Sequence, residues 1–252
     1  MKGLLAFRDV QLPGTVGVGL PQENLNSNRT EGVEILLNHR NKIGELGYNI
    51  GGNFFTTRTM DRDVIQGRAG NEYGHWKSSR SNRYTSIWWG KTYAGQFQGY
   101  DQIFNHPVNT GGGNNNTIPG DYYYEDWNED GVINEKDDQP IATKDIPLVN
   151  YGINLGLTFK NFDLNALFAG ATSFYVQYAE QYAEPLMYGR SSLTQFLDSW
   201  HTVNPGDNVF DPNTQWVPGN YPAMGSPIAE GTKAVQDASY LRLKTLELGY
   251  SV

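Results

Sequence analysis

The sequence of 252 residues contains no cysteine, which excludes a disulfide framework and a thiolate metal site. It also contains no apolar run close to the roughly 20 residues of a transmembrane helix, so any membrane crossing must be made by strands. Basic residues are scarce, because 19 lysines and arginines stand against 27 aspartates and glutamates, for a net charge of −8. This acidic balance argues against nucleic acid as a partner, since phosphate binding needs a basic face.

The residues that are abundant favour an all-β protein with long polar loops. The chain holds 29 glycines, 16 tyrosines and 6 tryptophans, and 38% of its residues are hydrophobic. Apolar segments are short and are separated by runs of turn-forming Gly, Pro and Asn. We expect strands at residues 3–10, 32–40, 46–59, 151–159, 162–170 and 239–250, and a short helix at 193–200. In the last strand the apolar phase shifts near Thr245, which predicts a β-bulge.

The segment 151–170 has the clearest pattern in the sequence. Apolar residues occupy the odd positions from Tyr151 to Phe159, with small or polar residues between them, and the alternation resumes at Phe162 after a polar break at 160–161. Because side chains of a strand point alternately to opposite faces, this pattern predicts a β-hairpin with one wholly apolar face. Each arm has about the 9–11 residues that a tilted strand needs to cross a bilayer. A strand of a soluble sandwich alternates in the same way, so the period alone does not decide between lipid and a protein core.

The connections between the expected strands alternate in length. Short turns are expected at 41–45 and 160–161, and long loops at about 11–30, 61–147 and 175–237. Outer-membrane barrels have this asymmetry, with brief periplasmic turns and extended extracellular loops. A soluble sandwich has less reason to place all its long loops at one end. The spacing therefore favours a barrel.

One acidic segment, residues 126–137, matches the spacing of a calcium-binding loop. Calcium takes several hard oxygen ligands around a flexible loop, and Gly131 stands at the position of the sharp turn. The expected ligands of a structural Ca²⁺ are Asp126, Asn128, Asp130, the carbonyl of Val132, Asn134 and Asp137. Position 137 holds an aspartate in place of the usual closing glutamate. The alternative is an acidic turn without an ion, held by hydrogen bonds from Asp and Asn side chains to the backbone.

Aromatic residues are concentrated in two blocks, at 84–104 and 173–188, with Trp200, Trp216 and Tyr221 beyond them. Such residues stack on sugar rings in some proteins. They also pack loops together and form the aromatic girdles of membrane barrels, and this second explanation suits any single residue better.

Residues arranged for catalysis are few. No ligand spacing joins the four histidines, which are His39, His75, His106 and His201. No G-x-S-x-G motif occurs, and acidic pairs such as Asp61 and Asp63 are more often solvated loop charges than a glycosidase pair. We therefore predict that the chain is not an enzyme.

Five segments carry a family resemblance. The block from Pro119 to Asp137 is similar to the pattern PGDxxYxDxNxDGxIxxxD, and residues 237–250 are nearly identical to DASYLRLKNxxLGY. The other three segments are Leu4–Leu5 with Leu12–Gly17, Asn28–Glu34, and Tyr151–Asn154 with Lys160–Leu164. In this order they resemble the C-terminal part of SusC/RagA-type TonB-linked outer-membrane proteins, and they cover almost the whole chain.

The resemblance implies a nutrient importer of the outer membrane. Members of the family form a large closed barrel, of the class with about 22 strands, whose lumen is plugged. A SusD-like surface lipoprotein closes over the mouth, an oligosaccharide or peptide is captured between the two, and TonB supplies energy by pulling on the plug. The plug, the TonB box and most strands are missing from this sequence. The resemblance thus implies a partial antiparallel transmembrane β-barrel with two unpaired edges.

Within the barrel that the resemblance implies, the alternation assigns the two faces of the hairpin. We expect lipid to contact Tyr151, Ile153, Leu155, Leu157, Phe162, Leu164 and Phe168. We expect the lumen to be lined by Asn154, Thr158, Asp163 and Asn165. The alternative is a secreted, soluble β-rich module that binds or cleaves glycans and uses the calcium loop for rigidity, in which case a second layer of protein would cover the apolar face.

Overall fold

The computed structural model describes residues 4–6, 23–108, 113–178 and 182–252 of the chain. The chain divides into two compact units. The first comprises the residues up to 87 together with 143–175 and 237–252, and the second comprises 88–142 and 176–236. In the described part of the chain, no helix is both long enough and apolar enough to span a membrane.

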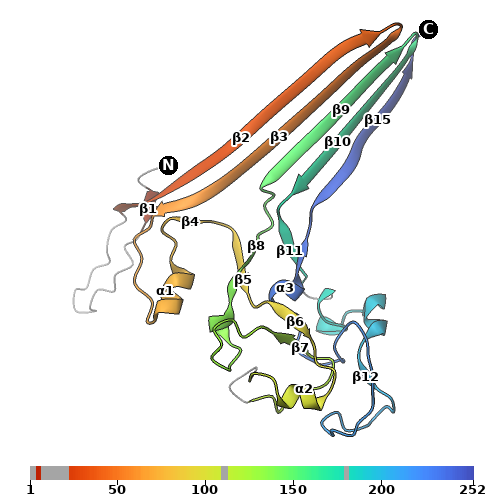
Figure 1. Ribbon diagram of the computed structural model, residues 1–252. Coiled ribbons are helices and arrows are strands. Elements are labelled where there is room, and N and C mark those ends of the chain that lie inside the picture. Colours follow the sequence, from red (N-terminus) through yellow and green to blue (C-terminus); the bar gives the residue numbers. More distant parts are fainter. Residues whose placement is uncertain (1–3, 7–22, 109–112, 179–181) are drawn as a thin grey trace. The chain divides into compact units, whose positions relative to one another are not determined.

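An antiparallel sheet of seven strands forms the first unit (Figure 1). Its strands are β1 (Leu4–Ala6), β2 (Glu23–Ile43), β3 (Leu46–Asp63), β4 (Arg83–Tyr84), β9 (Val149–Phe159), β10 (Phe162–Thr172) and β15 (Tyr240–Tyr250). Six of them follow the order β1-β2-β3-β9-β10-β15, and β4 pairs with β3. A short helix, α1 (Glu72–Ser78), precedes β4. Among the described residues, β15 has no partner on its outer edge and β2 pairs there only with β1.

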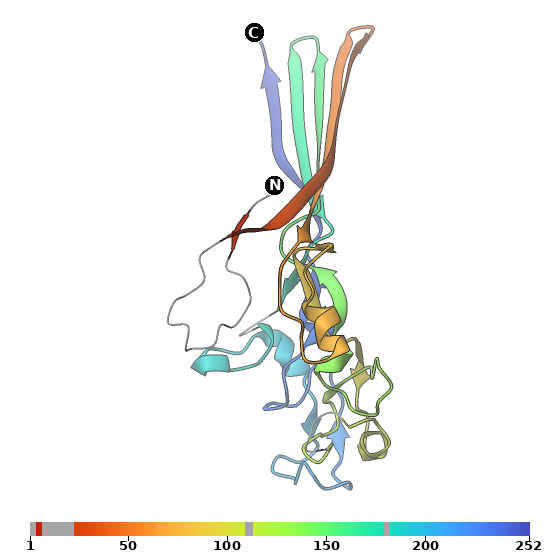
Figure 2. The ribbon, with the colours of Figure 1, turned by 90° about the vertical axis from the view of Figure 1, so that its left-hand side faces the viewer.

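The hairpin predicted at 151–170 is confirmed, with β9 and β10 joined by a turn at 160–161. The turn between β2 and β3 is equally tight and is centred on Gly44. Gly44 and Lys160 both have a positive φ, of 60° and 54°, which is the backbone that the tight turns of hairpins need. Both turns lie at the same end of the sheet (Figure 2). Short connections are therefore gathered at one end, as the sequence predicted.

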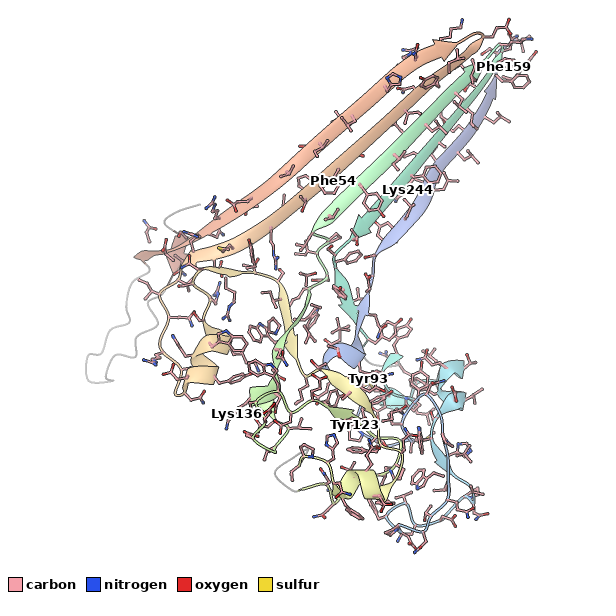
Figure 3. The ribbon with its side chains drawn as sticks, viewed as in Figure 1. Phe54, Tyr93, Tyr123, Lys136, Phe159 and Lys244 are labelled. Carbon is pink, nitrogen blue, oxygen red and sulfur yellow. The ribbon has the colours of Figure 1, made fainter. Side chains whose placement is uncertain are left out.

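The bulge predicted near Thr245 is also present. Leu167 pairs with Thr245, but the next residue of β10, Phe168, pairs with Leu243, so Lys244 is the extra residue of β15 (Figure 3). The insertion of one residue returns the leucines on its two sides to the same face of the sheet. Without it, the apolar residues of one half of β15 would point to the polar face.

Strands β2 and β3 are longer than the sequence predicted. The loop expected at 11–30 overlaps β2, which begins at Glu23, and residues 11–22 lie outside the described part. The added part is held by polar pairs across the two strands: Ser27 Oγ donates to Asp63 Oδ2 at 2.7 Å, and the hydroxyls of Thr30 and Thr59 are 2.8 Å apart. Because polar residues occupy both faces there, no alternation marked this part as strand.

The two long regions expected as loops, 61–147 and 175–237, contain short elements that build most of the second unit. They are β5 (Ile87–Gly90), β6 (Tyr93–Gln96), α2 (Tyr100–Phe104), β7 (Tyr122–Tyr124), η2 (Glu135–Asp137), β8 (Gln139–Thr143), β11 (Tyr175–Gln177), η4 (Met187–Gly189), η5 (Thr194–Asp198), β12 (His201–Thr202), β13 (Trp216–Val217), α3 (Gly231–Ala234) and β14 (Val235–Asp237). The strands pair two by two, as β5-β8, β6-β7, β11-β14 and β12-β13. The helix expected at 193–200 is the 3-10 helix η5.

Aromatic side chains hold the second unit together. Tyr122, Tyr124 and Ile133 form a buried cluster against which Tyr93 packs, with the Tyr93 and Tyr122 rings edge to face at 5.5 Å. Phe97 is fully buried. The first aromatic block of the sequence therefore contributes to loop packing, which is the second of the two explanations given for it.

Candidate functional site

The sheet of the first unit has one mainly apolar face, on which the register of β2 also places two polar residues, His39 and Asn41. In the register of the strands, apolar residues of β9 stand opposite apolar residues of β3 and β10, and those of β10 stand opposite the leucines of β15. The face comprises Val33, Ile35, Leu37 and Ile43 of β2; Leu46, Tyr48, Ile50 and Phe54 of β3; Val149, Tyr151, Ile153, Leu155, Leu157 and Phe159 of β9; Phe162, Leu164, Ala166 and Phe168 of β10; and Leu241, Leu243, Leu246, Leu248 and Tyr250 of β15. All seven residues expected to contact lipid share this face.

This apolar face is exposed. Ile153 is 47% exposed, Leu243 48% and Leu248 75%. A soluble sandwich buries such a face against a second sheet, about 10 Å away. The described residues of the first unit place no such layer on it, and the sandwich alternative therefore lacks this feature within the unit.

The height of the apolar face fits a bilayer. β9, β10 and β15 each have 11 residues. About ten rises of roughly 3.4 Å, tilted by about 40°, give a height of about 26 Å, close to the band of about 25 Å on outer-membrane barrels. The strands thus have the length that a crossing needs.

Aromatic residues stand at both ends of the apolar face. Phe159, Phe162 and Tyr250 lie beside the turns, with the rings of Phe162 and Tyr250 4.8 Å apart. Phe54 and Tyr151 pair near the other end; Phe54 and Phe159 mark the two levels in Figure 3. Membrane barrels carry such girdles where the apolar band meets the two membrane surfaces.

The opposite face is small and polar. It carries the four residues expected to line the lumen, Asn154, Thr158, Asp163 and Asn165, together with Asn38, Arg40, Lys42, Asn49, Asn53 and the glycines 47, 51, 152, 156 and 249. A β-carbon at Gly51 would overlap the side chains of Asn38 and Asn154, so these amides lie over the glycine backbone. Three large apolar residues, Leu36, Phe55 and Leu167, also share this face.

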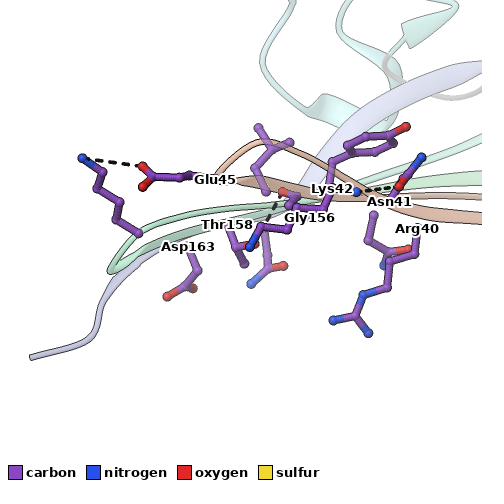
Figure 4. A pocket seen from close by; sticks show the side chains of 13 residues that line it. Arg40, Asn41, Lys42, Glu45, Gly156, Thr158 and Asp163 are labelled. Carbon is purple, nitrogen blue, oxygen red and sulfur yellow. Dashed lines mark hydrogen bonds and ion pairs between the residues drawn. The ribbon is translucent and has the colours of Figure 1, made fainter.

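At the turn end, the polar face forms an open hollow of about 850 Å³ (Figure 4). Charged side chains of both signs line it, among them Arg40, Lys42 and Asp163. Lys160 Nζ lies 3.7 Å from Glu45 Oε2, which joins the two turns by an ion pair. The register of β2, β3, β9 and β10 places Arg40 and Lys42 on the same side of the sheet as Asp163. The sequence could not show this, because it predicted a turn at 41–45.

The predicted calcium loop forms one compact turn in the second unit. Asp126 Oδ2 accepts a hydrogen bond from the Gly131 amide at 2.7 Å, and Asn128 Oδ1 accepts one from the Asp130 amide at 3.0 Å. Asp130 Oδ1 accepts one from the Val132 amide at 2.9 Å. The side chains of the first three expected ligands are therefore folded over the loop backbone.

The last expected ligand, Asp137, is fully buried and closes the loop. Its carboxylate accepts hydrogen bonds from the amides of Trp127 at 3.0 Å and Asn134 at 2.7 Å. The described residues contain no group of three or more Asp, Glu, His or Cys side chains arranged to hold a metal ion. These hydrogen bonds are those expected for an acidic turn that holds no ion. Each carboxylate oxygen also has a second lone pair, which could bind a cation. Calcium binding stays a prediction.

Comparisons with known proteins agree with this fold. No family model matches the sequence. The TonB-dependent receptor P26 of Formosa agariphila is 26% identical over 145 residues, which are 54% of this chain and 13% of that protein. The structure of the RagAB peptide transporter is similar with a TM-score of 0.59 and 19% identity, over 96% of this chain and 24% of that one. The RagAB peptide importer in the open-open state is similar with a TM-score of 0.61 and 19% identity, over 99% and 25%.

The chain therefore spans a quarter or less of the length of each of these proteins. Its fold is that of an antiparallel barrel wall, and the described sheet is open, with the two edges that the sequence predicted. The sequence match and the fold match together confirm the resemblance to SusC/RagA-type TonB-dependent proteins and place the chain in the outer membrane.

Proposed function

We propose that this chain forms part of the barrel wall of a TonB-dependent importer. The observation that carries the proposal is the pairing of a mainly apolar face with a small, polar opposite face across β2, β3, β9, β10 and β15. A wall between lipid and a water-filled lumen needs these two faces and no second layer of protein. The proposal assigns no catalytic step to the chain, in keeping with relatives named as a receptor and a transporter.

The long insertions would face the outside. Residues 64–148, which include the short strand β4, and residues 173–239 connect the long strands at the ends opposite the short turns. In outer-membrane barrels the short turns are periplasmic, so these insertions would be extracellular. There they would contact the substrate, an oligosaccharide or a peptide, and a SusD-like lipoprotein, while TonB would act through a plug encoded elsewhere in the complete protein.

Two arginine substitutions on neighbouring residues test the proposal. In the complete protein, Leu155→Arg should reduce the amount of folded barrel in the outer membrane far more than Asn154→Arg does. The reason is that a cation on the lipid side at mid-bilayer costs roughly 2–4 kcal/mol, whereas one in the lumen stays hydrated. The folded amount is measured by electrophoresis of the membrane fraction, in which a folded barrel changes its mobility when the sample is heated. Equal losses from the two substitutions would contradict the assigned facing.

We also propose that the loop at 126–137 binds calcium as a structural ion. Asp126, Asn128 and Asp130 would hold it with their side-chain oxygens, and the buried Asp137 would keep the loop closed. Titration calorimetry of the complete protein should show calcium-dependent heat that Asp130→Asn removes. Glu129→Gln, which makes the same change of charge one residue away, is the control and should keep the heat. Absence of calcium-dependent heat in the unaltered protein would remove this proposal.

A further inference from the structure

Basic residues are concentrated in one segment of the first unit, residues 58–83. This segment holds six of the 19 lysines and arginines of the chain but only three of its 27 aspartates and glutamates, so it carries a net charge of +3 in a chain of −8. It begins in the last part of β3, four residues beyond Phe54, which stands at the end of the apolar face away from the short turns. In the orientation proposed above, this end lies at the outer surface of the membrane.

Arg58 stands on the same face of the sheet as the apolar band. The pairing of β3 with β2 has no register shift between Phe54 and Met60, so alternate residues of β3 keep one face there and Arg58 shares the face of Phe54. Arg62 follows where the register shifts, and its Nη1 lies 3.9 Å from the sulfur of Met60 on that same face. Two guanidinium groups therefore continue the lipid-facing side of the sheet beyond its apolar part.

Neither of these two arginines is neutralised by the protein. Among the described residues, no aspartate or glutamate lies within ion-pair distance of Arg58 or Arg62. Glu31, which stands opposite Arg58 in the register, pairs with Arg29. Asp63, the residue after Arg62, accepts a hydrogen bond of 2.7 Å from a serine hydroxyl of β2. The positive charge of both guanidinium groups is thus left for a partner outside the described chain.

An aromatic ring holds Arg58 in place. Its guanidinium carbon lies 3.8 Å from the centre of the Tyr84 ring, and the pairing of β4 with β3 brings this ring to it. The face of a ring attracts the positive charge but does not accept the N–H groups in the plane of the guanidinium. Arg58 Nε is enclosed by the protein, whereas its terminal nitrogens are not among the enclosed atoms. The terminal N–H groups are therefore the donors that a ligand can reach.

The height of Arg58 above the apolar band corresponds to lipid head groups. Four rises of roughly 3.4 Å, tilted by about 40°, place it about 10 Å beyond Phe54, and aromatic girdles mark the level where an apolar band meets the membrane surface. On the opposite face of β3, Asp61 and Arg80 neutralise each other with a separation of 2.8 Å. The uncompensated charge is therefore on the side that lipid contacts.

The chemistry of the two side chains selects phosphate. A guanidinium group binds phosphate through two parallel N–H···O bonds, and it is more weakly hydrated than an ammonium group. The glycolipid in the outer leaflet of an outer membrane carries phosphate on its sugar head group, at the level assigned to Arg58. The two arginines are four residues apart on one strand, about 13 Å, so they reach separate phosphate groups.

We propose that Arg58 and Arg62 bind the head-group phosphates of a glycolipid in the outer leaflet. The terminal N–H groups of each arginine donate to phosphate oxygens, and the Tyr84 ring keeps the Arg58 guanidinium in position. The bound head group steadies the part of the hairpin of β2 and β3 that projects beyond the bilayer. This inference rests on the proposed facing and orientation of the barrel wall.

Native mass spectrometry of the complete protein in detergent tests the inference, with bisphosphorylated lipid A as the probe. Lipid A from which both phosphates have been removed is the comparison ligand. We expect lipid A to bind, and the dephosphorylated form to bind at least tenfold more weakly. Arg58→Gln and Arg62→Gln should each weaken lipid A about fivefold, and together roughly thirtyfold, which is the usual contribution of single cations at an anionic membrane surface.

The matched control is the double variant Arg40→Gln with Lys42→Gln, which removes two charges at the opposite end of the same hairpin and should leave lipid A binding unchanged. Equal binding of the two forms of lipid A, or equal weakening in the control, would overturn the inference. Displacement of lipid A by millimolar inorganic phosphate would overturn it too, because the arginines would then bind free phosphate and not a lipid. Binding in detergent does not depend on the facing test with Leu155→Arg and Asn154→Arg, so failure here leaves the importer proposal to its own result.

Discussion

Leu157 in β9 lies directly opposite Leu164 in β10, and both side chains stand on the same face of the sheet. Leu164 in turn lies opposite Leu248 of β15. Rows of this kind repeat along the strands, so the apolar band is a property of the register and not of any single strand. The free-energy cost of a charged substitution on this face should therefore depend on its depth in the apolar band.

Depth dependence can be tested with two leucines of the same face. Leu155 is near the middle of β9, whereas Leu46 is the first residue of β3, next to the turn. Leu155→Arg should destabilise the complete barrel by roughly 2–4 kcal/mol and Leu46→Arg by about 0–1 kcal/mol, because the cation near the interface stays in contact with water and lipid head groups. Reversible urea unfolding in lipid vesicles gives both values. If Leu46→Arg destabilised the barrel as much as Leu155→Arg, the apolar band would not lie in the bilayer.

Gly120 is one of the glycines on which the packing of the second unit depends. Its φ is +91°, and a β-carbon there would collide with the indole of Trp200, whose own amide donates to the Tyr221 carbonyl at 2.8 Å. Gly120→Ala should therefore raise amide hydrogen exchange at Trp200 by more than tenfold. Gly206→Ala, at a φ of +97° with open space around it, carries only the backbone penalty and should leave that amide protected. Similar exchange in the two variants would mean that the indole is not packed on Gly120.

The buried carboxyl of Asp121 should make the second unit sensitive to pH. Burial raises its pKa, against the opposing effects of the Ser226 hydroxyl and the Ile118 amide. A carboxyl whose pKa is raised by folding favours the folded state below its ordinary pKa of about 4, and this contribution is lost as the pH rises through the raised value. Asp121→Asn should then slow hydrogen exchange around residue 121 at pH 7, with a difference that disappears below about pH 4. The exposed Asp101→Asn is the control. Faster exchange in Asp121→Asn at pH 7 would show that the carboxylate is stabilised by its surroundings.

The hairpin, its facing and the bulge were predictable because they depend on a period of two, which is a geometric property of every strand. The shift at Thr245 shows this well, since a break in the period identified the bulge within one residue of Lys244. The polar extensions of β2 and β3 could not be predicted in this way. Ser27 and Asp63 are 36 residues apart, and only their pairing makes that part a strand.

The second unit also contains a pocket of about 720 Å³, lined by residues around Asp121, Trp200 and Trp216, which could not be predicted from the sequence either. Trp200 and Trp216 were noted there as aromatic residues, and Asp121 as part of a motif, but nothing local relates them. They meet because loops from two regions of the chain pack on a common aromatic core, and such packing has no sequence period. The calcium loop is the opposite case, since all its residues lie within 126–137 and its compact geometry follows from local spacing.

The central claim is that the apolar face of β9 contacts lipid and its polar face contacts water. This chain has no cysteine of its own. In the complete protein, with any cysteine outside this chain replaced by serine, single cysteines can be introduced at successive positions from Ile153 to Thr158 and spin-labelled in lipid vesicles. Collision with oxygen, which concentrates in lipid, should be high at 153, 155 and 157, and collision with a water-soluble nickel chelate should be high at 154, 156 and 158. A uniform profile, or one of opposite phase, would contradict the account.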